Sequence, residues 1–325
     1  MPKLSKKQEE GVTNIFFVTD VHGSDKCFRK FINSAKFYGA SVLILGGDIT
    51  GKLIIPIRKL DEKHMVCTYP DGDLKIKSKE LDDKIKDIRD SGYYPYVCNQ
   101  EEFDKLRTDK GALDTLFQKL MVESVDRWIK LANERLQGTG VKCYISPGND
   151  DIFAIDEHLV DEGAVLNPEN KVVKIDDSHE MITLGYVNHT PWHSPREVDE
   201  SKLEEMLENL CSKVENMKSC IFNIHIPPIN TKIDQAPALT RDLKPITTGG
   251  HVQTMSAGSV ATRHVIERHQ PLVGLHGHIH ESKGFDIIGR TMCFNPGSDY
   301  AEGTLKGLFL RLEKEKIKSH MFTVG

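Results

Sequence analysis

Residues 14–48 read NIFFVTDVHGSDKCFRKFINSAKFYGASVLILGGD, and this stretch decides the fold. Its two apolar runs, 14–19 and 41–45, have the length and composition of buried strands. Between them Ser24 can cap a helix. Apolar residues then recur at the spacing of one helix face: Cys27, Phe28, Phe31, Ile32 and Ala35. A strand–helix–strand unit of this kind predicts two parallel strands joined by a right-handed crossover.

The same alternation of strands and helices runs through the rest of the chain. Apolar runs predict further strands at 141–146, 171–175, 181–187, 219–224 and 272–275, with three more before the end. Apolar residues at helical spacing predict helices at about 113–136, 203–214 and 256–269. The sum is one layered α/β domain of residues 1–325 with mixed sheets.

Residues 51–107 interrupt this alternation, and we interpret them as an insertion into the domain. The segments IIPIRKL and HMVCTYPDGDLKIKS favour a β-hairpin or ribbon, and a charged helix is predicted at about 79–90. Two roles remain open for the insertion: a cap over a functional site, or a contact in a homodimer.

Composition excludes several classes of partner. The 325 residues are 38% hydrophobic and 28% charged, as in a globular protein. The formal net charge of -5 gives no global positive field, so we do not expect nucleic acid or an anionic membrane as partner. No stretch approaches the ~20 apolar residues of a membrane span, and the N-terminal MPKLSKKQEEGVTN lacks the apolar core of a secretory signal. The seven scattered cysteines form no CxxC pair, which predicts free thiols and a cytoplasmic location.

Five predicted strands end directly in residues that commonly bind metals. They are Asp20 and His22 after the first strand, Asp48 after the second, Asn149 and Asp150 after 141–146, His225 after 219–224, and His278 and His280 after 272–275. Because the carboxyl ends of strands form the functional edge of an α/β sheet, we expect these clusters to converge at one sheet edge. Each cluster alone has an ordinary explanation as a helix cap, a turn or a core histidine; the series of five outweighs it.

The residue types in these clusters point to divalent cations. Carboxylate, imidazole and amide ligands suit Mn, Fe, Zn, Co or Ni, and we favour Mn. Seven candidate ligands are too many for one tetrahedral ion, but they suit two ions if one carboxylate bridges. Two ions ~3.5–4 Å apart can clamp a phosphoryl group and lower the pKa of a water between them. His278 and His280 alternate along the chain, so both can serve only if the chain turns there, as Gly277 permits.

The motifs Asp20-Val21-His22, Gly47-Asp48, Gly148-Asn149, His225 and Gly277-His278-Ile279-His280 resemble, in order and strand context, those of the calcineurin-like metallophosphoesterases. The resemblance covers roughly residues 14 to 300. Two further stretches, GSVATRHVIERHQPLVGLHGHIHES and IGRTMCFNPGSDY, look like an Icc-related subgroup of predicted phosphoesterases, whose substrates are largely undefined.

The resemblance implies a fold, a ligand set and a reaction. The fold is a four-layer α/β/β/α sandwich of two mixed sheets. The first metal would be held by Asp20, His22, Asp48 and His280, and the second by Asp48, Asn149, His225 and His278, with Asp48 bridging. A metal-bridging hydroxide would attack the phosphorus in line.

The sequence departs from the family pattern beside the second metal. The family often has histidine after Gly-Asn, close to the leaving-group oxygen, whereas this chain has Asp150. Asp150 could protonate the leaving group only if its pKa were raised. Otherwise the enzyme prefers good leaving groups, or His189 or His251 supplies the proton. The Gly-Asp motif also differs from the pattern, continuing as Ile-Thr-Gly. We predict Asp150 and His225 as the catalytic residues.

Three other side chains, with Asn149, are predicted to contact the substrate. The segment NHTPWHSPRE, residues 188–197, is either a plain loop or a pocket rim in which Trp192 stacks and Arg196 binds phosphate. Ser259 and Arg263 open a predicted helix and could bind an anion at its N-terminus.

The sequence therefore predicts a metal-dependent hydrolase of a small phosphate ester, either a phosphodiester or a phosphomonoester such as a nucleotide. One alternative is a non-catalytic metal-binding scaffold, which the change to Asp150 favours. Another is a mononuclear metal amidohydrolase, which would hold about one ion per chain.

Overall fold

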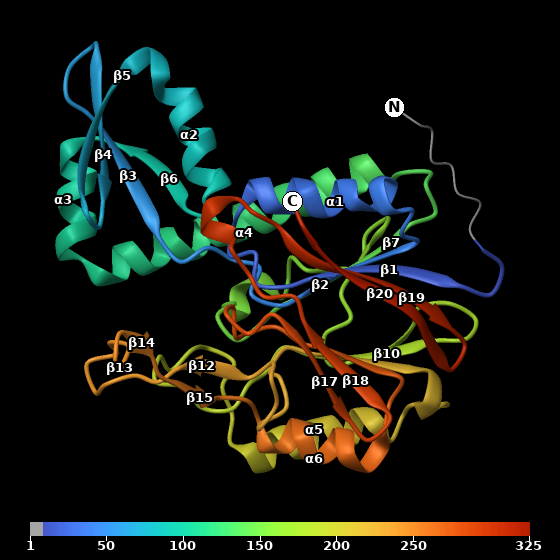
Figure 1. Ribbon diagram of the computed structural model, residues 1–325. Helices are drawn as coiled ribbons and strands as arrows, with labels where there is room; N and C mark the ends of the chain where they lie inside the picture. Colours follow the sequence, from blue (N-terminus) through green and yellow to red (C-terminus); the bar gives the residue numbers. More distant parts are fainter. Residues whose placement is uncertain (1–8) are drawn as a thin grey trace.

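The computed structural model describes residues 9–325. Its body consists of two six-stranded sheets packed face to face, with helices on both outer faces (Figure 1). The first sheet has the order β20 (Lys316–Val324), β19 (Lys306–Glu313), β1 (Thr13–Val18), β2 (Val42–Gly46), β7 (Lys142–Ser146) and β8 (Val165–Leu166). The second has the order β17 (Gly284–Ile288), β18 (Thr291–Asn295), β16 (Val273–Leu275), β11 (Cys220–Ile224), β10 (Glu180–Leu184) and β9 (Val172–Lys174). Both sheets are mixed, so the predicted four-layer α/β/β/α sandwich is confirmed.

Three apolar layers hold the sandwich together. Helices α1 (Asp25–Tyr38) and α4 (Lys110–Leu136) cover the first sheet, and the rings of Phe28 and Trp128 stack at 4.2 Å where the two helices meet. Helices α5 (Glu200–Cys211) and α6 (Val260–His269) cover the second sheet. The central layer lies between the sheets and includes Phe17, Ile44 and Leu275, all fully buried. Burial of these faces supplies most of the driving force for folding.

The opening unit forms as its sequence predicts. Strands β1 and β2 are parallel, with Ile15 opposite Val42. The Ser24 side chain accepts a hydrogen bond from the backbone N–H of Cys27, and Gly39 closes α1 in the left-handed conformation at φ 67°. The predicted apolar face of α1 is buried against the sheet. The crossover therefore brings the residues after β1 and β2 to the same edge.

The insertion is larger and more regular than the expected ribbon. Its sheet has the order β5 (Gly72–Lys77), β4 (His64–Tyr69), β3 (Ile54–Lys59) and β6 (Tyr94–Cys98), flanked by α2 (Leu81–Asp90) and α3 (Gln100–Thr108). We call residues 53–108 the lobe. It has its own small core, made of Ile55, Ile57, Met65, Cys67, Ile76 and Ile88. The sequence reading missed α3 and the parallel pairing of β3 with β6.

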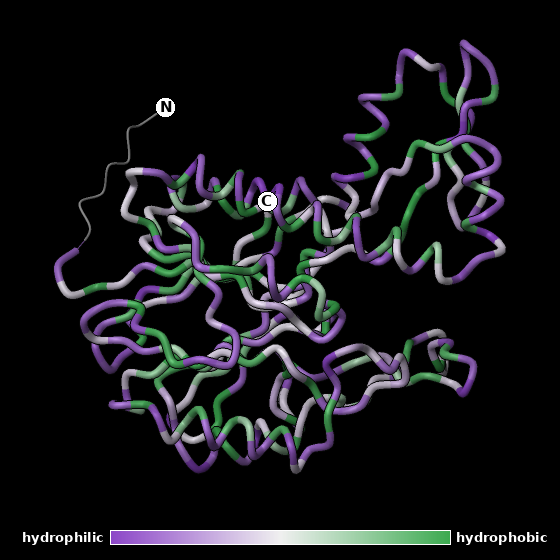
Figure 2. Tube along the Cα trace, turned by 180° about the vertical axis from the view of Figure 1, so that it is seen from behind, coloured by the Kyte–Doolittle hydropathy of each residue, from purple (hydrophilic) through white to green (hydrophobic). Residues whose placement is uncertain are grey.

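A second projection was not predicted. Residues 235–256, which we call the arm, form two small antiparallel pairs, β12 (Gln235–Pro237) with β15 (Thr254–Ser256) and β13 (Thr247–Thr248) with β14 (His251–Val252). Lobe and arm extend from the same side of the body, as the front and back views agree (Figures 1 and 2). The lobe follows β2 and begins five residues beyond Asp48, and the arm follows β11 and begins ten residues beyond His225.

Short 3₁₀ helices complete the described elements, at Ser78–Glu80, Phe153–Ile155, Met217–Ser219 and Tyr300–Glu302. Within residues 9–325, no helix has the length and apolar character needed to cross a bilayer. The N-terminal stretch in which we expect no secretory signal falls largely in residues 1–8, outside the described part.

Candidate metal centre

The seven predicted ligands gather where five strands end. Asp20 and His22 follow β1, Asp48 follows β2 and Asn149 follows β7, all in the first sheet. The others follow strands of the second sheet: His225 follows β11, and His278 and His280 follow β16. The expectation of a single sheet edge was therefore wrong. The site lies where the carboxyl edges of both sheets meet, and the backbone N–H of His278 donates across the junction to Asp20 Oδ2 at 3.0 Å.

Four of these residues have left-handed backbone. The φ angles are 54° at Asp20, 38° at His22, 50° at Asp48 and 65° at His278. Non-glycine residues rarely adopt this conformation, and it persists only where the surroundings enforce it, commonly at functional sites. The expected turn between the last two histidines is present: the N–H of Ile279 donates to the carbonyl of Gly277 at 2.7 Å, and His278 is the residue with left-handed backbone.

Gly277 and Gly148 have another role: they allow neighbouring residues to approach their backbone closely. A Cβ on Gly277 would lie 2.1 Å from Thr19 Oγ1 and 2.4 Å from Asp20 Oδ2. A Cβ on Gly148 would lie 2.3 Å from both the backbone nitrogen and Oδ1 of Asp48. Any side chain at either position would push a predicted ligand out of place.

One group of donors comprises Asp20, His22 and His280. Asp20 Oδ1 lies 3.3 Å from His280 Nε2, and the Nε2 atoms of His22 and His280 are 3.0 Å apart. His22 Nε2 also lies 3.6 Å from Asp48 Oδ2. The donor atoms of Asp20, His22 and His280 all lie within 4.8 Å of one another, which is close enough for a single ion to bind them.

A second group lies on the other side of Asp48. His225 Nε2 is 3.5 Å from Asp48 Oδ1 and 3.7 Å from Asp20 Oδ1. His278 Nδ1 lies 2.7 Å from Asn149 Oδ1. The two oxygens of Asp48 therefore face different groups, Oδ2 towards His22 and Oδ1 towards His225. Asp20 also approaches His225, so both carboxylates lie between the groups.

These residues fit a pair of divalent cations. Asp20 and Asp48 are buried side by side, and buried carboxylates are costly without compensating positive charge. His225 Nε2 is buried between them, and no hydrogen-bond partner for it is found among residues 9–325. Three imidazoles besides His225, one amide and two carboxylates form the donor set of a hard-to-borderline divalent metal site.

The electrostatics of the site favour cations. Burial alone would lower the pKa of His225, but Asp48 and Asp20 outweigh it and raise the pKa to about 10. Burial lowers the pKa of His22 to about 3 and that of His278 to about 4. Neutral imidazole is the form that coordinates metals. The strong negative potential at His225 is the potential that a bound metal ion would neutralise.

Asp151 joins two of the ligand-bearing loops, and it was not predicted from the sequence. Its carboxylate accepts from the backbone N–H groups of Ile49 at 3.0 Å, Thr50 at 2.8 Å and Gly148 at 2.7 Å. Burial and the charge of Asp48 raise the pKa of Asp151 to about 6. The side chain fixes the loop after β2 against the loop after β7, and the second aspartate of the Gly-Asn-Asp-Asp run was its sequence signal.

A relay of hydrogen bonds orients the amide of Asn149. Its Nδ2 donates to Ser194 Oγ and to Asp150 Oδ1, both at 2.9 Å. Ser194 Oγ in turn donates to Glu197 Oε1 at 2.8 Å. With its nitrogen held this way, Asn149 presents its oxygen towards His278. Partners of this kind orient metal ligands in many sites.

Asp150 lies at the site but is not free. Its Oδ2 is 2.5 Å from the ammonium of Lys52, a residue that the sequence reading did not select. One oxygen of Asp150 also lies within 4.8 Å of donors on His22 and Asp48. Burial and the charge of Asp48 raise the pKa of Asp150, while Lys52 opposes that rise.

Arg196 does not lie at a pocket rim, and its predicted role in binding substrate phosphate is corrected. The side chain is buried, with 1% of the residue exposed. Its Nε donates to the carbonyl of Asp151 at 2.9 Å, and its Nη2 pairs with Asp156 Oδ1 at 2.5 Å. Phe153 covers the guanidinium at 4.6 Å. Arg196 is thus a structural cation that braces the loop beyond Asn149.

The predicted anion site at the start of α6 is also corrected, because the protein fills it. The carboxylate of Glu200 accepts from Ser259 Oγ at 2.7 Å and from the N–H of Ala261 at 2.8 Å. Arg263 turns away and donates through Nη1 to the carbonyl of Ile229 at 2.9 Å. An internal carboxylate at a helix N-terminus satisfies the groups that a phosphate would bind.

Trp192 remains open as a substrate contact. The residue is 62% exposed, on the loop whose Ser194 contacts Asn149. The two histidines considered as alternative acids lie differently: His189 pairs with Asp199 at 3.0 Å, and His251 is exposed on β14 in the arm.

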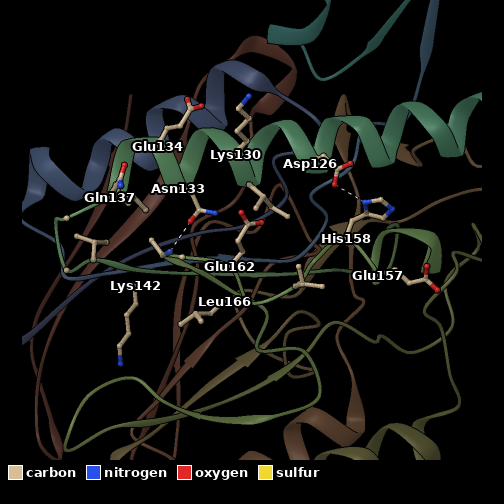
Figure 3. A pocket seen from close by; sticks show the side chains of 18 residues that line it. Asp126, Lys130, Asn133, Glu134, Gln137, Lys142, Glu157, His158, Glu162 and Leu166 are labelled. Carbon is tan, nitrogen blue, oxygen red and sulfur yellow. Dashed lines mark hydrogen bonds and ion pairs between the residues drawn. The ribbon is translucent and has the colours of Figure 1, made fainter.

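A groove of about 1230 Å³ lies elsewhere, between α4 and residues 157–166, and none of the seven ligands lines it (Figure 3). Asn133 Oδ1 accepts from the N–H of Ala164 at 2.9 Å, and His158 Nδ1 lies 2.8 Å from Asp126. These polar groups hold the neighbouring segment against the helix.

Comparisons with known proteins agree with the fold. No family model matches the chain. An uncharacterized protein of Methanocaldococcus jannaschii, MJ1162, is 34% identical over 152 residues, which are 46% of this chain and 61% of that protein. The match thus spans less than two thirds of that relative. The solved structure of TT1561 of Thermus thermophilus has 14% identity and a TM-score of 0.51, with 97% of this chain and 98% of that chain covered. Another solved structure has 16% identity and a TM-score of 0.57, with 94% and 98% covered. The chain shares the overall fold of these two structures.

Proposed function

We propose that this chain is a metal-dependent hydrolase of phosphate esters, a calcineurin-like metallophosphoesterase in mechanism. The observation that carries the proposal is Asp48, whose two carboxylate oxygens face two separate groups of donors. Bound there, two divalent ions would act as Lewis acids on a phosphoryl group and lower the pKa of the attacking water.

The residues have distinct roles in this proposal. The first ion would be held by Asp20, His22, Asp48 and His280, and the second by Asp48, Asn149, His225 and His278; Mn is the favoured metal. Asp151 and Ser194 keep the ligand loops in place, as their hydrogen bonds support. Asp150 stays the predicted proton donor, and its position beside His22 and Asp48 supports a place near the leaving group.

The substrate is a small phosphorylated molecule. The acidic overall balance and the chemistry of the site support a small ester over nucleic acid. The exposed Trp192 supports a substrate with an aromatic or base-like leaving group. The seven buried free thiols support a reducing compartment such as the cytoplasm. A homodimer through the lobe remains a proposal that the mass in solution will test.

Hydrolysis of bis-p-nitrophenyl phosphate and p-nitrophenyl phosphate tests the function. The metal-stripped protein should be inactive, and added Mn should restore turnover of at least one substrate. The ratio of the two rates will separate a diesterase from a monoesterase. With both ions shown bound by elemental analysis, no turnover of either would support the scaffold alternative, which the replacement of histidine by Asp150 favours. About one ion per chain would instead support a mononuclear hydrolase.

The role of Asp150 has its own test. Asp150→Ala should slow alkyl phosphates, whose leaving groups need a proton, more than it slows p-nitrophenyl phosphate. An equal loss on both would show that Asp150 is not the donor.

A further inference from the structure

Lys52 brings a positive charge to a centre whose predicted ligands are anionic or neutral. Its Nζ lies 2.5 Å from Asp150 Oδ2, and 46% of its side chain is exposed. It follows Asp48 by four positions, on the loop that leaves the body for the lobe. The side chain is thus both close to the metal centre and open to solvent.

The loop that carries Lys52 is held on both sides. The N–H of Gly51 donates to the Tyr94 hydroxyl at 2.7 Å, and the N–H of Tyr94 donates to the carbonyl of Leu53 at 2.9 Å. On the body side, Thr50 donates to Asp151 Oδ1 through its N–H at 2.8 Å and its hydroxyl at 2.6 Å. The backbone around Lys52 is therefore fixed by hydrogen bonds on both sides, which reduces the entropy lost when the side chain binds a ligand.

Lys52 is positively charged at neutral pH. Burial would lower the pKa of Lys52, but Asp150 and Asp48 outweigh it and raise the pKa above the usual value. An ammonium group has three N–H donors, and the contact with Asp150 needs only one of them. The side chain can pair with Asp150 and still donate to the oxygens of an anion.

We propose that Lys52 is a substrate-binding residue that donates to the non-bridging oxygens of the phosphoryl group at the metal centre. This inference rests on the proposed function. In this arrangement the Asp150 carboxylate positions the ammonium of Lys52 beside the metal centre. Proton donation by Asp150 requires its neutral form, so the two roles belong to different protonation states of the side chain. Lys52 itself transfers no proton, because it remains an ammonium throughout.

The first test measures phosphate binding in the Mn-loaded protein, by calorimetry and by competitive inhibition of bis-p-nitrophenyl phosphate hydrolysis. Lys52→Met should weaken binding of inorganic phosphate about 10- to 100-fold, as expected for one charge-assisted hydrogen bond. Lys52→Arg should retain most of the wild-type affinity for phosphate. The matched control is Lys59→Met, at the exposed end of β3, which should bind phosphate as the wild type does. Metal content and melting temperature should be unchanged in all three variants.

The double variant Lys52→Met/Asp150→Asn separates direct binding from simple neutralisation of Asp150. If Lys52 contacts the phosphate, removing Asp150 will not restore binding. Recovery to near wild-type affinity would overturn the proposal, because Lys52 would then only mask a repulsive carboxylate. Unchanged phosphate affinity in Lys52→Met, with wild-type turnover intact, would overturn it while leaving the proposed function in place. A wild-type protein that holds two ions but neither binds phosphate nor hydrolyses either ester would refute both.

Discussion

The loops that carry the predicted ligands and the lobe of residues 53–108 differ in how the rest of the molecule holds them. Asp20, His22 and Asp48 are buried with left-handed backbone, and hydrogen bonds to the Asp20 carboxylate and to the carbonyl of Gly46 join their loops to the second sheet. The lobe has a separate core of six buried residues, and its strand β5 is almost entirely exposed. It is tied to the body near the site by the hydrogen bond from Gly51 to Tyr94 and by the one from Ser24 Oγ to the carbonyl of Asp90.

This difference shows which packing positions the predicted metal ligands. The metal centre depends on the packing of two sheets, because its ligands come from both. The lobe has its own core and meets the body near the centre at two places: the loop of Lys52, and Gly92, where a Cβ would lie 2.3 Å from the carbonyl oxygen of His22. Changes in the body should therefore alter metal binding, whereas changes within the lobe should leave the ligands in place.

The largest effect is expected for Asp48→Ala. Its carboxylate faces both donor groups, so its loss should abolish turnover and lower the metal content below two ions per chain. The loss of activity should exceed the roughly 10- to 100-fold typical of residues that only orient ligands. Elemental analysis and steady-state kinetics will measure both; near-normal turnover would refute a role between two ions.

Gly277→Ala should be nearly as damaging. The added methyl would overlap Thr19 and the Asp20 carboxylate, and such overpacking typically costs about 1–3 kcal/mol. Metal content and the free energy of unfolding should both fall. Gly111→Ala in α4 is the matched control, because its Cβ would meet nothing closer than 3.4 Å; it should be neutral or slightly stabilising. Equal effects at the two positions would contradict the close packing at Gly277.

Ser194→Ala should produce an intermediate effect. It removes the acceptor for Asn149 Nδ2 while leaving every predicted ligand present. Metal affinity or kcat should fall about 10-fold, as for other partners that orient ligands. Titration of the stripped protein with Mn will report the affinity. Ser194→Thr keeps the hydroxyl and should retain most of it; no loss in the alanine variant would remove Ser194 from the site.

A smaller, pH-dependent effect is expected at Glu169, whose partner Gly185 packs against Pro147 in the loop that carries Asn149. Its carboxylate accepts from the N–H of Gly185 at 3.0 Å, and burial raises its pKa from 4.5 to about 7. The folded state therefore binds the proton more tightly than the unfolded state. This stabilisation is complete below pH 4.5 and is lost as the pH rises through 7.

Urea unfolding at pH 5 and pH 8 will measure this loss of stabilisation. The wild type should lose about 1–2 kcal/mol over this range relative to Glu169→Gln, less than the full shift would give because the residue is only partly buried. Parallel pH profiles for the two proteins would contradict the raised pKa.

The smallest effect on metal content is expected for Ile57→Ala in the lobe. Ile57 is fully buried there, and its truncation should destabilise the lobe by about 2–5 kcal/mol. Hydrogen exchange should rise in residues 53–108, while the protein still binds two ions. Ile44→Ala, at an equally buried position between the two sheets, should lower metal affinity as well. Metal loss in the lobe variant would show that lobe and site are one cooperative unit.

Much of the body could be predicted because its strands and helices carry strong local patterns. Helix α1 has a serine cap, an apolar face and a closing glycine, and all three act as predicted. The arm could not be predicted, because its two- and three-residue strands are too short to show a period. Arg196 and Arg263 were wrongly predicted to bind substrate, because the sequence shows that a cation is present but not whether a carboxylate or carbonyl already binds it.

The site was partly predictable for a related reason. Ligands that follow apolar strands are visible in sequence, since strand ends share an edge. Lys52, Asp151 and Ser194 act through three-dimensional contacts with residues more than 40 positions away, and no spacing rule marks them. The left-handed turn at His278 is likewise set by packing against Asp20, whose carboxylate accepts from its N–H at 3.0 Å.

Anomalous diffraction from crystals of the Mn-loaded protein, recorded at the manganese edge, tests the account most directly. Two peaks ~3.5–4 Å apart are predicted, with Asp48 touching both and with His22 and His225 on opposite sides. A single peak, or two peaks that do not share Asp48, would contradict it.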